Sequence, residues 1–237
     1  MEFLKINDQL IEYKLAYSKR ARIISYTIKD GRVFVTLPPH LLERQAKDFI
    51  LENGEEIVKK ICKIRENDIS PYQYQSGEKF FYRGRQYTLQ IAEEDHPNNV
   101  LLQGGHLYVY IPPGLDENEK KLAVRSRIDT FFQDNAFKIL DGLARYYSRL
   151  MEIPYKPIKI KNQRTRWGSC SNSGSINLNW RIIMAPNQVI TYVVIHELTH
   201  LKYEDHSREF WALVAQHMPE YKKWKKWLAD NSESLAM

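Results

Sequence analysis

The segment that runs from Pro186 to His200 constrains the fold of this chain more than any other. Its sequence is PNQVITYVVIHELTH, in which apolar residues recur at helical spacing, and proline suits the first position of a helix. The segment therefore predicts an apolar helix, with His196 and His200 one turn apart near its end. A small sheet is expected to lie beside this helix.

The two histidines and the glutamate between them form the pattern HExxH, which is typical of a catalytic metal site. Residues i and i+4 of a helix lie about 40° apart around its axis and about 6 Å apart along it, so His196 and His200 can face one metal ion. Glu197 projects about 100° away from His196 and can reach a water molecule beside the metal. With His206 as a third ligand, the sequence predicts one Zn²⁺ ion per chain and Glu197 as the general base.

The segment after the helix departs from a known zinc-site pattern. The spacing from His200 to His206 equals that of metzincin sites, but Tyr203 stands where those sites have a glycine. That glycine lets the chain leave the helix and turn back. We therefore expect a different turn, built around Glu204 and Asp205, and the chain is not a metzincin by sequence.

Two other interpretations of the histidines stay open. The three residues could be ordinary core or surface histidines that match the pattern by coincidence. Alternatively, the metal could be structural, in which case a fourth protein ligand would close the site. The sequence offers no cysteine or carboxylate at motif spacing for that role, and Glu197 faces the wrong way.

Four stretches of the chain carry a family resemblance. They are RTRWGSCS at 164–171, INLNWR at 176–181, HELTHL at 196–201 and HSREFW at 206–211. In these stretches the chain resembles the YgjP-like metallopeptidase family, which is described as predicted metal-dependent hydrolases and is similar to the WLM and SprT zinc-protease domains. The resemblance covers the chain from about residue 155 to the end. It implies His196, His200 and His206 as metal ligands and Glu197 as the catalytic base, but no particular substrate.

The expected fold class is α+β, with two domains. Residues 1–115 form an N-terminal region of β-hairpins and helix, and residues 116–237 form a zincin-like domain. The second domain is expected to hold a small antiparallel sheet beside the active-site helix that carries HExxH.

Local patterns predict the elements of both regions. Residues 24–39 and 100–113 each contain two strands with alternating apolar residues, a glycine turn and a Pro-Pro pair, which predict two β-hairpins. The likeness of the two segments has two explanations, an internal duplication or the same local constraints acting independently. A third hairpin is predicted at 79–91. Apolar periodicity predicts helices at about 41–65, 116–147, 210–218 and 221–228, and strands are predicted at 158–161 and 175–179. Asp116 and Glu119 predict a capping box at the start of the long helix.

Composition favours a soluble cytoplasmic protein. The 237 residues suit one large or two small domains, and no apolar run approaches the ~20 residues that cross a membrane. The N-terminus lacks the sequence pattern of a signal peptide, and no membrane partner is expected. Cys62 and Cys170 are too few and too far apart for a disulfide framework.

The chain is basic, with a formal net charge of +6 and a pI of about 9.1. This charge favours acidic partners, although a solvated basic surface is the simpler interpretation. Near the C-terminus, four lysines alternate with aromatic residues, namely Lys222, Lys223, Lys225 and Lys226 among Tyr221 and Trp224. Such a pattern can bind nucleic acid, but we favour a helix with buried aromatics and solvated lysines.

Several other residues are weaker candidates for the site. Arg164 and Arg166 could bind a substrate carboxylate or phosphate, stabilise an oxyanion, or pair with surface carboxylates. Tyr203 and Tyr221 are possible oxyanion donors, and Cys170 is expected to be a packed cysteine instead of a metal ligand. Surface or packing roles are expected for the remaining histidines, which are His40, His96, His106 and His217.

These patterns favour a zinc-dependent hydrolase that acts on a peptide or protein. One alternative keeps the metal and replaces the peptide with a phosphoanhydride, a nucleotide or another small phosphorylated substrate. Another alternative is a DNA-associated protease or binding module, whose binding would fall steeply with salt. The sequence leaves the oligomeric state open.

Overall fold

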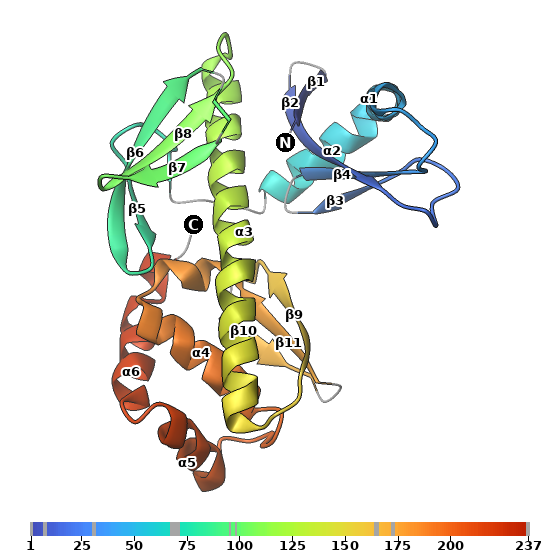
Figure 1. Ribbon diagram of the computed structural model, residues 1–237. Coiled ribbons are helices and arrows are strands. Elements are labelled where there is room, and N and C mark those ends of the chain that lie inside the picture. The colour runs from blue at the N-terminus through green and yellow to red at the C-terminus, as the bar shows by residue number, and fades with distance from the viewer. Residues whose placement is uncertain are drawn as a thin grey trace. The chain divides into compact units, whose positions relative to one another are not determined.

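The computed structural model describes residues 2–6, 9–29, 32–66, 72–94, 96–97, 99–163, 166–171 and 174–235. The chain has an α+β fold with several small sheets (Figure 1). It divides into two compact units, which are treated separately below. Unit 1 comprises Met1–Ser70 and Ile111–Ser126, and unit 2 comprises Pro71–Tyr110 and Arg127–Met237. Within the described ranges, no helix is both long enough and apolar enough to cross a membrane.

Unit 1 contains a four-stranded sheet in the order β1-β2-β4-β3. Its strands are β1 (Glu2–Ile6), β2 (Gln9–Tyr17), β3 (Ser25–Lys29) and β4 (Arg32–Leu37). β3 and β4 pair antiparallel, which confirms the hairpin predicted at 24–39. β2 lies parallel to β4 on its other side, and the sequence analysis anticipated neither β1 nor β2. Alternate residues of β4, Val33, Val35 and Leu37, are buried in the core.

The single helix predicted at 41–65 is wrong, because the chain forms two helices there. α1 (Glu43–Glu52) ends at Asn53, whose side-chain amide and backbone N–H both donate to the carbonyl of Phe49. α2 (Gly54–Glu66) begins at a glycine that β1 approaches closely, since an added Cβ would lie 2.5 Å from Cγ2 of Ile6. The apolar stripe gave no sign of this break, since its buried residues in both helices, Ala46, Ile50, Ile57 and Ile61, belong to one core.

The long helix α3 (Glu117–Met151) starts in unit 1 and continues into unit 2. The backbone N–H of Glu119 donates to Oδ1 of Asp116 at 2.9 Å, and the backbone N–H of Asp116 donates to Oε2 of Glu119 at 3.0 Å. These two bonds confirm the predicted capping box. The helix ends four residues later than predicted, just before Glu152, which has a left-handed φ of +55°.

A second four-stranded sheet, in the order β5-β6-β8-β7, belongs mainly to unit 2. Its strands are β5 (Lys79–Tyr82), β6 (Arg85–Glu93), β7 (Val100–Gln103) and β8 (His106–Ile111). β5 pairs antiparallel with β6, and β7 pairs antiparallel with β8. The hairpins predicted at 79–91 and 100–113 are therefore confirmed.

The β5–β6 turn is bonded to the segment that leads into the motif helix. The backbone N–H of Arg83 donates to the carbonyl of Ile183 at 2.7 Å, and that of Gly84 donates to the carbonyl of Met184 at 3.0 Å. Nε of Arg83 also donates to Oδ1 of Asn187 at 2.8 Å. These contacts lie within unit 2, which includes residues 71–110. The predicted domain boundary at residue 115 stays a prediction.

The third sheet, in the order β10-β11-β9, lies beside the motif helix. Its strands are β9 (Lys156–Lys161), β10 (Gly168–Cys170) and β11 (Ser175–Asn179). β10 pairs antiparallel with β11, but β9 pairs parallel with it, so the antiparallel sheet that was predicted is in fact mixed. The parallel pair is possible because β9 and β11 are joined by a long connection instead of a tight turn. β10 forms one edge of this sheet.

The remaining elements surround the motif helix α4 (Asn187–Thr199). They are the 3₁₀-helix η1 (Trp180–Met184), α5 (Arg208–His217), α6 (Tyr221–Asn231) and the 3₁₀-helix η2 (Glu233–Leu235). α4 contacts η1, α5, α6, β10 and β11. The structure has helices in the three ranges predicted from Pro186 onward, whereas η1 and η2 were not anticipated.

We predict that Gly84→Ala destabilises the protein more than Gly105→Ala. Both glycines have positive φ, +75° and +80°, so each alanine strains the backbone by about 1–2 kcal/mol. Only at position 84 would the new Cβ meet backbone, at 2.9 Å from Cα of Pro186, which adds about 1–3 kcal/mol. Urea unfolding of both variants measures the difference. Equal losses in the free energy of unfolding would contradict this contact.

Candidate metal centre and its cleft

Burial from nearly every side determines the position of α4. Its sequence is rich in β-branched residues, which have below-average helix propensity, so tertiary packing must stabilise the helix. The buried residues are Val189, Ile190, Tyr192, Val193, Val194, Ile195, Glu197, Leu198 and Thr199. His196 and Glu197 lie in its last turn, and His200 follows as the C-terminal cap. These three side chains are thus presented from a helix that is fixed in its surroundings.

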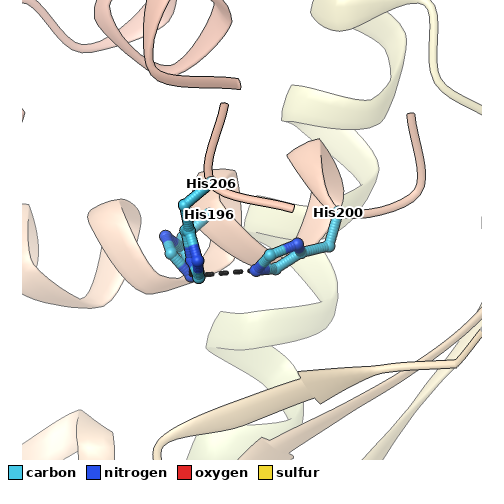
Figure 2. Close-up of side chains that lie close together, drawn as sticks. All are labelled: His196, His200 and His206. Carbon is cyan, nitrogen blue, oxygen red and sulfur yellow. Dashed lines mark hydrogen bonds between the residues drawn. The ribbon is translucent and has the colours of Figure 1, made fainter. Parts of the chain in front are cut away.

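The three predicted metal ligands lie together, with their rings directed toward one another (Figure 2). Nε2 of His196 is 3.2 Å from Nε2 of His200 and 3.2 Å from Nε2 of His206. One ring nitrogen of each residue lies within 4.8 Å of the others. Nitrogens bound tetrahedrally to zinc at 2.0–2.1 Å are about 3.3–3.4 Å apart, so the spacing fits a shared metal ion.

The turn after α4 orients His200. The backbone N–H groups of Lys202 and Tyr203 both donate to the carbonyl of Thr199 at 3.0 Å, which tightens the end of the helix. The carbonyl of Tyr203 then lies 3.2 Å from Nδ1 of His200. When Nδ1 carries the proton and donates it there, Nε2 is left free for a metal. The turn begins before the predicted Glu204 and Asp205, where the chain bends again.

The protonation state of His196 also suits metal binding. Burial, with smaller contributions from His200 and His206, lowers the pKa of His196 to about 3. The ring is therefore neutral at pH 7, and neutral imidazole is the form that binds metal. Among the described residues, Nδ1 of His196 has no hydrogen-bond partner.

Glu197 is a buried carboxylate, with only 6% of its surface exposed. Burial raises its pKa to about 7, although the positive charge of Arg166 acts in the opposite direction. Its Oε2 atom has no hydrogen-bond partner within the described part of the chain. A buried, unsatisfied carboxylate is costly, and a neighbouring cation would offset that cost. This environment fits a site that holds a divalent metal.

Gly168 on β10 leaves the space that the side chain of Glu197 occupies. A Cβ at position 168 would lie 2.6 Å from Cγ, Cδ and Oε1 of Glu197. Cys170 lies two residues after Gly168 on the same strand. Burial and the charge of Glu197 raise the pKa of its thiol to about 11. Cys170 is half-buried, and its expected role as a packed cysteine stays a prediction.

A cleft of about 580 Å³ opens onto the histidines and Glu197. Three segments form most of it: the edge strand β10, the end of α4 and the turn that leads to His206. The lining residues are Pro154, Arg166, Gly168, Ser169, Cys170, Ser171, Gly174, His196, Glu197, His200, Leu201, Lys202, Glu204 and His206. The cleft is therefore lined by positively and negatively charged side chains and by an edge strand.

Not all of the weaker candidate residues lie in this cleft. Arg166 lines the cleft, whereas Arg164 and the side chain of Cys62 lie outside the described part of the chain. Of the described tyrosines, neither Tyr203 nor Tyr221 is a lining residue of this cleft. Nor does the cleft include the four single histidines, of which His96 stacks on Tyr110 at 4.0 Å.

The sequence analysis missed three residues that shape the site. Gly168 contacts the side chain of Glu197, and Phe210 and Trp211 pack against the histidine rings. Each belongs to a stretch that carried the family resemblance, RTRWGSCS or HSREFW. Those stretches were the available signal, but spacing alone gives no role to a glycine or an aromatic residue.

Comparisons with known proteins point to a metallopeptidase. A family model described as the YgjP-like metallopeptidase domain matches residues 22–231. Among solved structures, the chain is similar to the metallopeptidase zymogen of Pyrococcus abyssi abylysin, at 25% identity over 38% of this chain and 93% of that one. The TM-score is 0.35. Among curated proteins, no significant match is found.

We predict that the cost of Gly168→Ala depends on Glu197. In the wild-type background, the new methyl group would force a buried carboxylate to move, at a cost of about 1–3 kcal/mol. In a Glu197→Ala background the clashing atoms are gone, so the same substitution should cost much less. A double-mutant cycle from urea unfolding measures this coupling. An equal cost in both backgrounds would contradict the contact.

Proposed function

Because the chain belongs to the YgjP-like metallopeptidase family, whose domain model covers residues 22–231, we propose a zinc site formed by His196, His200 and His206, with Glu197 as the general base. Membership of the family makes the protein a metal-dependent peptidase. One observation carries the finer proposal: the 3.2 Å separations that bring three Nε2 atoms together beside a buried glutamate.

The donor set suits catalytic zinc. Three protein ligands are typical of catalytic zinc sites, whereas structural sites usually have four. Among the described residues, the cluster of possible ligands contains these three histidines and no fourth group. A zinc ion bound there would polarise a substrate carbonyl and lower the pKa of its water toward 7.

Glu197 would move the protons of the reaction. As a carboxylate, one of its oxygens accepts a proton from the attacking water, and the protonated acid then donates it to the leaving amine. Its raised pKa, about 7, favours transfer in both directions near neutral pH. A bound cation would favour the ionised form, so Glu197 would start as the base.

The edge of β10 supports an extended peptide as the substrate. Gly168, Ser169 and Cys170 line the cleft, and β11 is the only described strand that pairs with β10. An extended peptide could therefore pair with the free backbone edge, which would align a scissile bond with Glu197. Arg166 and Lys202 line the same cleft and could bind a substrate carboxylate.

The two alternative functions have less support. A phosphorylated substrate would meet Arg166 and Lys202, but also the carboxylates of Glu197 and Glu204 in the same cleft. For nucleic acid, the aromatic rings near the C-terminus would have to be free to stack on bases. Lys223 lies over the ring of Trp224 at 4.6 Å, and Lys225 lies over that of Trp211 at 4.2 Å. These contacts favour solvated lysines that cover packed aromatics.

We predict that Glu197→Gln keeps the metal and loses turnover. Glutamine has nearly the same size but cannot accept the proton, so kcat should fall by about 10²–10⁴-fold. Hydrolysis of a fluorogenic peptide library and elemental analysis of bound metal measure the two effects. A Glu197→Gln variant as active as the wild type would show that the base is misassigned.

We also predict one zinc ion per chain in the purified protein. His206→Ala should weaken zinc binding strongly, because it removes one of three ligands, whereas His217→Ala is the matched control and should leave binding unchanged. Elemental analysis after dialysis against a weak chelator distinguishes the variants. Unchanged zinc in His206→Ala would exclude His206 as a ligand, and no zinc in wild type after zinc is supplied would contradict the proposed site.

A further inference from the structure

His206 is the least constrained of the three proposed ligands. His196 and His200 belong to a buried helix and its cap, whereas His206 lies in an exposed segment before α5. Nδ1 of His200 has a carbonyl partner, but no hydrogen bond holds Nδ1 of His206 among the described residues. Its ring must therefore be oriented by other contacts.

The ring of Trp211 provides the clearest of these contacts. The imidazole of His206 stacks on it, with ring centroids 5.4 Å apart and planes 19° apart. Trp211 lies in the first half of α5, which begins at Arg208, two residues after His206. The hydroxyl of Ser207 accepts the backbone N–H of Phe210 at 3.3 Å and caps this helix. The chain therefore turns so that Trp211 returns to the histidine.

Trp211 is itself held by α6. The ring of Tyr221 stacks on Trp211 at 5.1 Å and 14°, and Nζ of Lys225 lies 4.2 Å from the centre of its indole ring. Aromatic and cation–π contacts of this kind contribute about 0.5–1.5 kcal/mol each beyond the burial of surface. A column of rings, His206, Trp211 and Tyr221, thus connects the proposed ligand to α6.

Phe210 has a different place in the same cluster. Its ring is fully buried and lies 5.0, 4.6 and 4.8 Å from those of His196, His200 and His206. It therefore packs against all three imidazoles as part of the core. Trp211 is less buried, and it stacks in parallel only with His206 among the three, whereas its ring lies 5.9 Å from that of His196 at an angle of 50°.

We propose that Trp211, braced by Tyr221 and Lys225 of α6, is a positioning residue that holds the ring of His206 ready for the metal. This inference rests on the proposed role of His206 as a ligand. Partners that orient metal-binding histidines are usually hydrogen-bonded carboxylates or carbonyls, and their loss weakens binding by about 10–100-fold. At His206 the stacked indole takes that place, because a ring fixed before binding loses less conformational freedom when the metal arrives.

The test compares Trp211→Leu, Trp211→Phe and Tyr221→Ala with the matched control Trp224→Ala. Trp224 lies on α6 and carries Lys223 over its ring, but it is not part of the column. Three quantities are measured: the Kd for Zn²⁺ by chelator competition, the visible absorption spectrum of the Co²⁺ form, and the melting temperature of the metal-free protein. The spectrum reports ligand geometry, which a loss of stability alone would not change.

Trp211→Leu should raise the Kd about 10–100-fold and alter the Co²⁺ spectrum, whereas Trp211→Phe should restore most of the affinity. Tyr221→Ala should give a smaller loss, and Trp224→Ala should bind like the wild type. A folded Trp211→Leu variant with wild-type Kd and spectrum would overturn the inference. If Trp211→Leu does not fold, a folded Tyr221→Ala with wild-type Kd and spectrum would overturn it instead.

Failure of the proposed zinc site would give a different pattern. In that case the wild type and His206→Ala would have the same Kd for Zn²⁺. If His206→Ala loses zinc while the Trp211 variants bind normally, the zinc site stands and only the positioning role of Trp211 is overturned.

Discussion

The site depends on the rigid burial of α4. The seven residues of α4 before the motif, 189–195, are all β-branched or aromatic. Such residues have lower helix propensity than alanine or leucine, so contacts with the surrounding elements keep the segment helical. The β5–β6 turn bonds to the chain just before α4, β10 lies beside Glu197, Phe210 of α5 packs against the histidines, and α6 also contacts α4. Because these contacts come from different parts of unit 2, small movements of α4 would disturb all of them.

Burial also sets the electrostatics of the candidate centre. His196 is kept neutral, and Glu197 is held where its charge is poorly solvated. Without a cation nearby, such a carboxylate is a cost to folding. Three imidazoles beside a poorly solvated carboxylate are what a divalent ion can stabilise, so the same packing that creates the cost also favours metal binding.

The sequence predicted much of this arrangement where the information is local. The capping box at Asp116, three hairpins and the motif helix follow from short-range patterns. The break at Asn53 has a local signal, the Asn53-Gly54 pair, which the continuous apolar stripe outweighed in the prediction. The parallel pairing of β9 depends on a long connection and has no local signature. The role of Gly168 likewise arises from Glu197, which is close in space but distant in the chain.

X-ray absorption at the zinc edge of the zinc-loaded protein tests the central claim most directly. The account predicts three imidazole nitrogens at about 2.0–2.1 Å and one further light-atom ligand, with no sulfur. A sulfur scatterer at about 2.3 Å would bring a cysteine into the site and contradict the donor set. Only two imidazoles around the zinc would contradict the three-histidine centre itself.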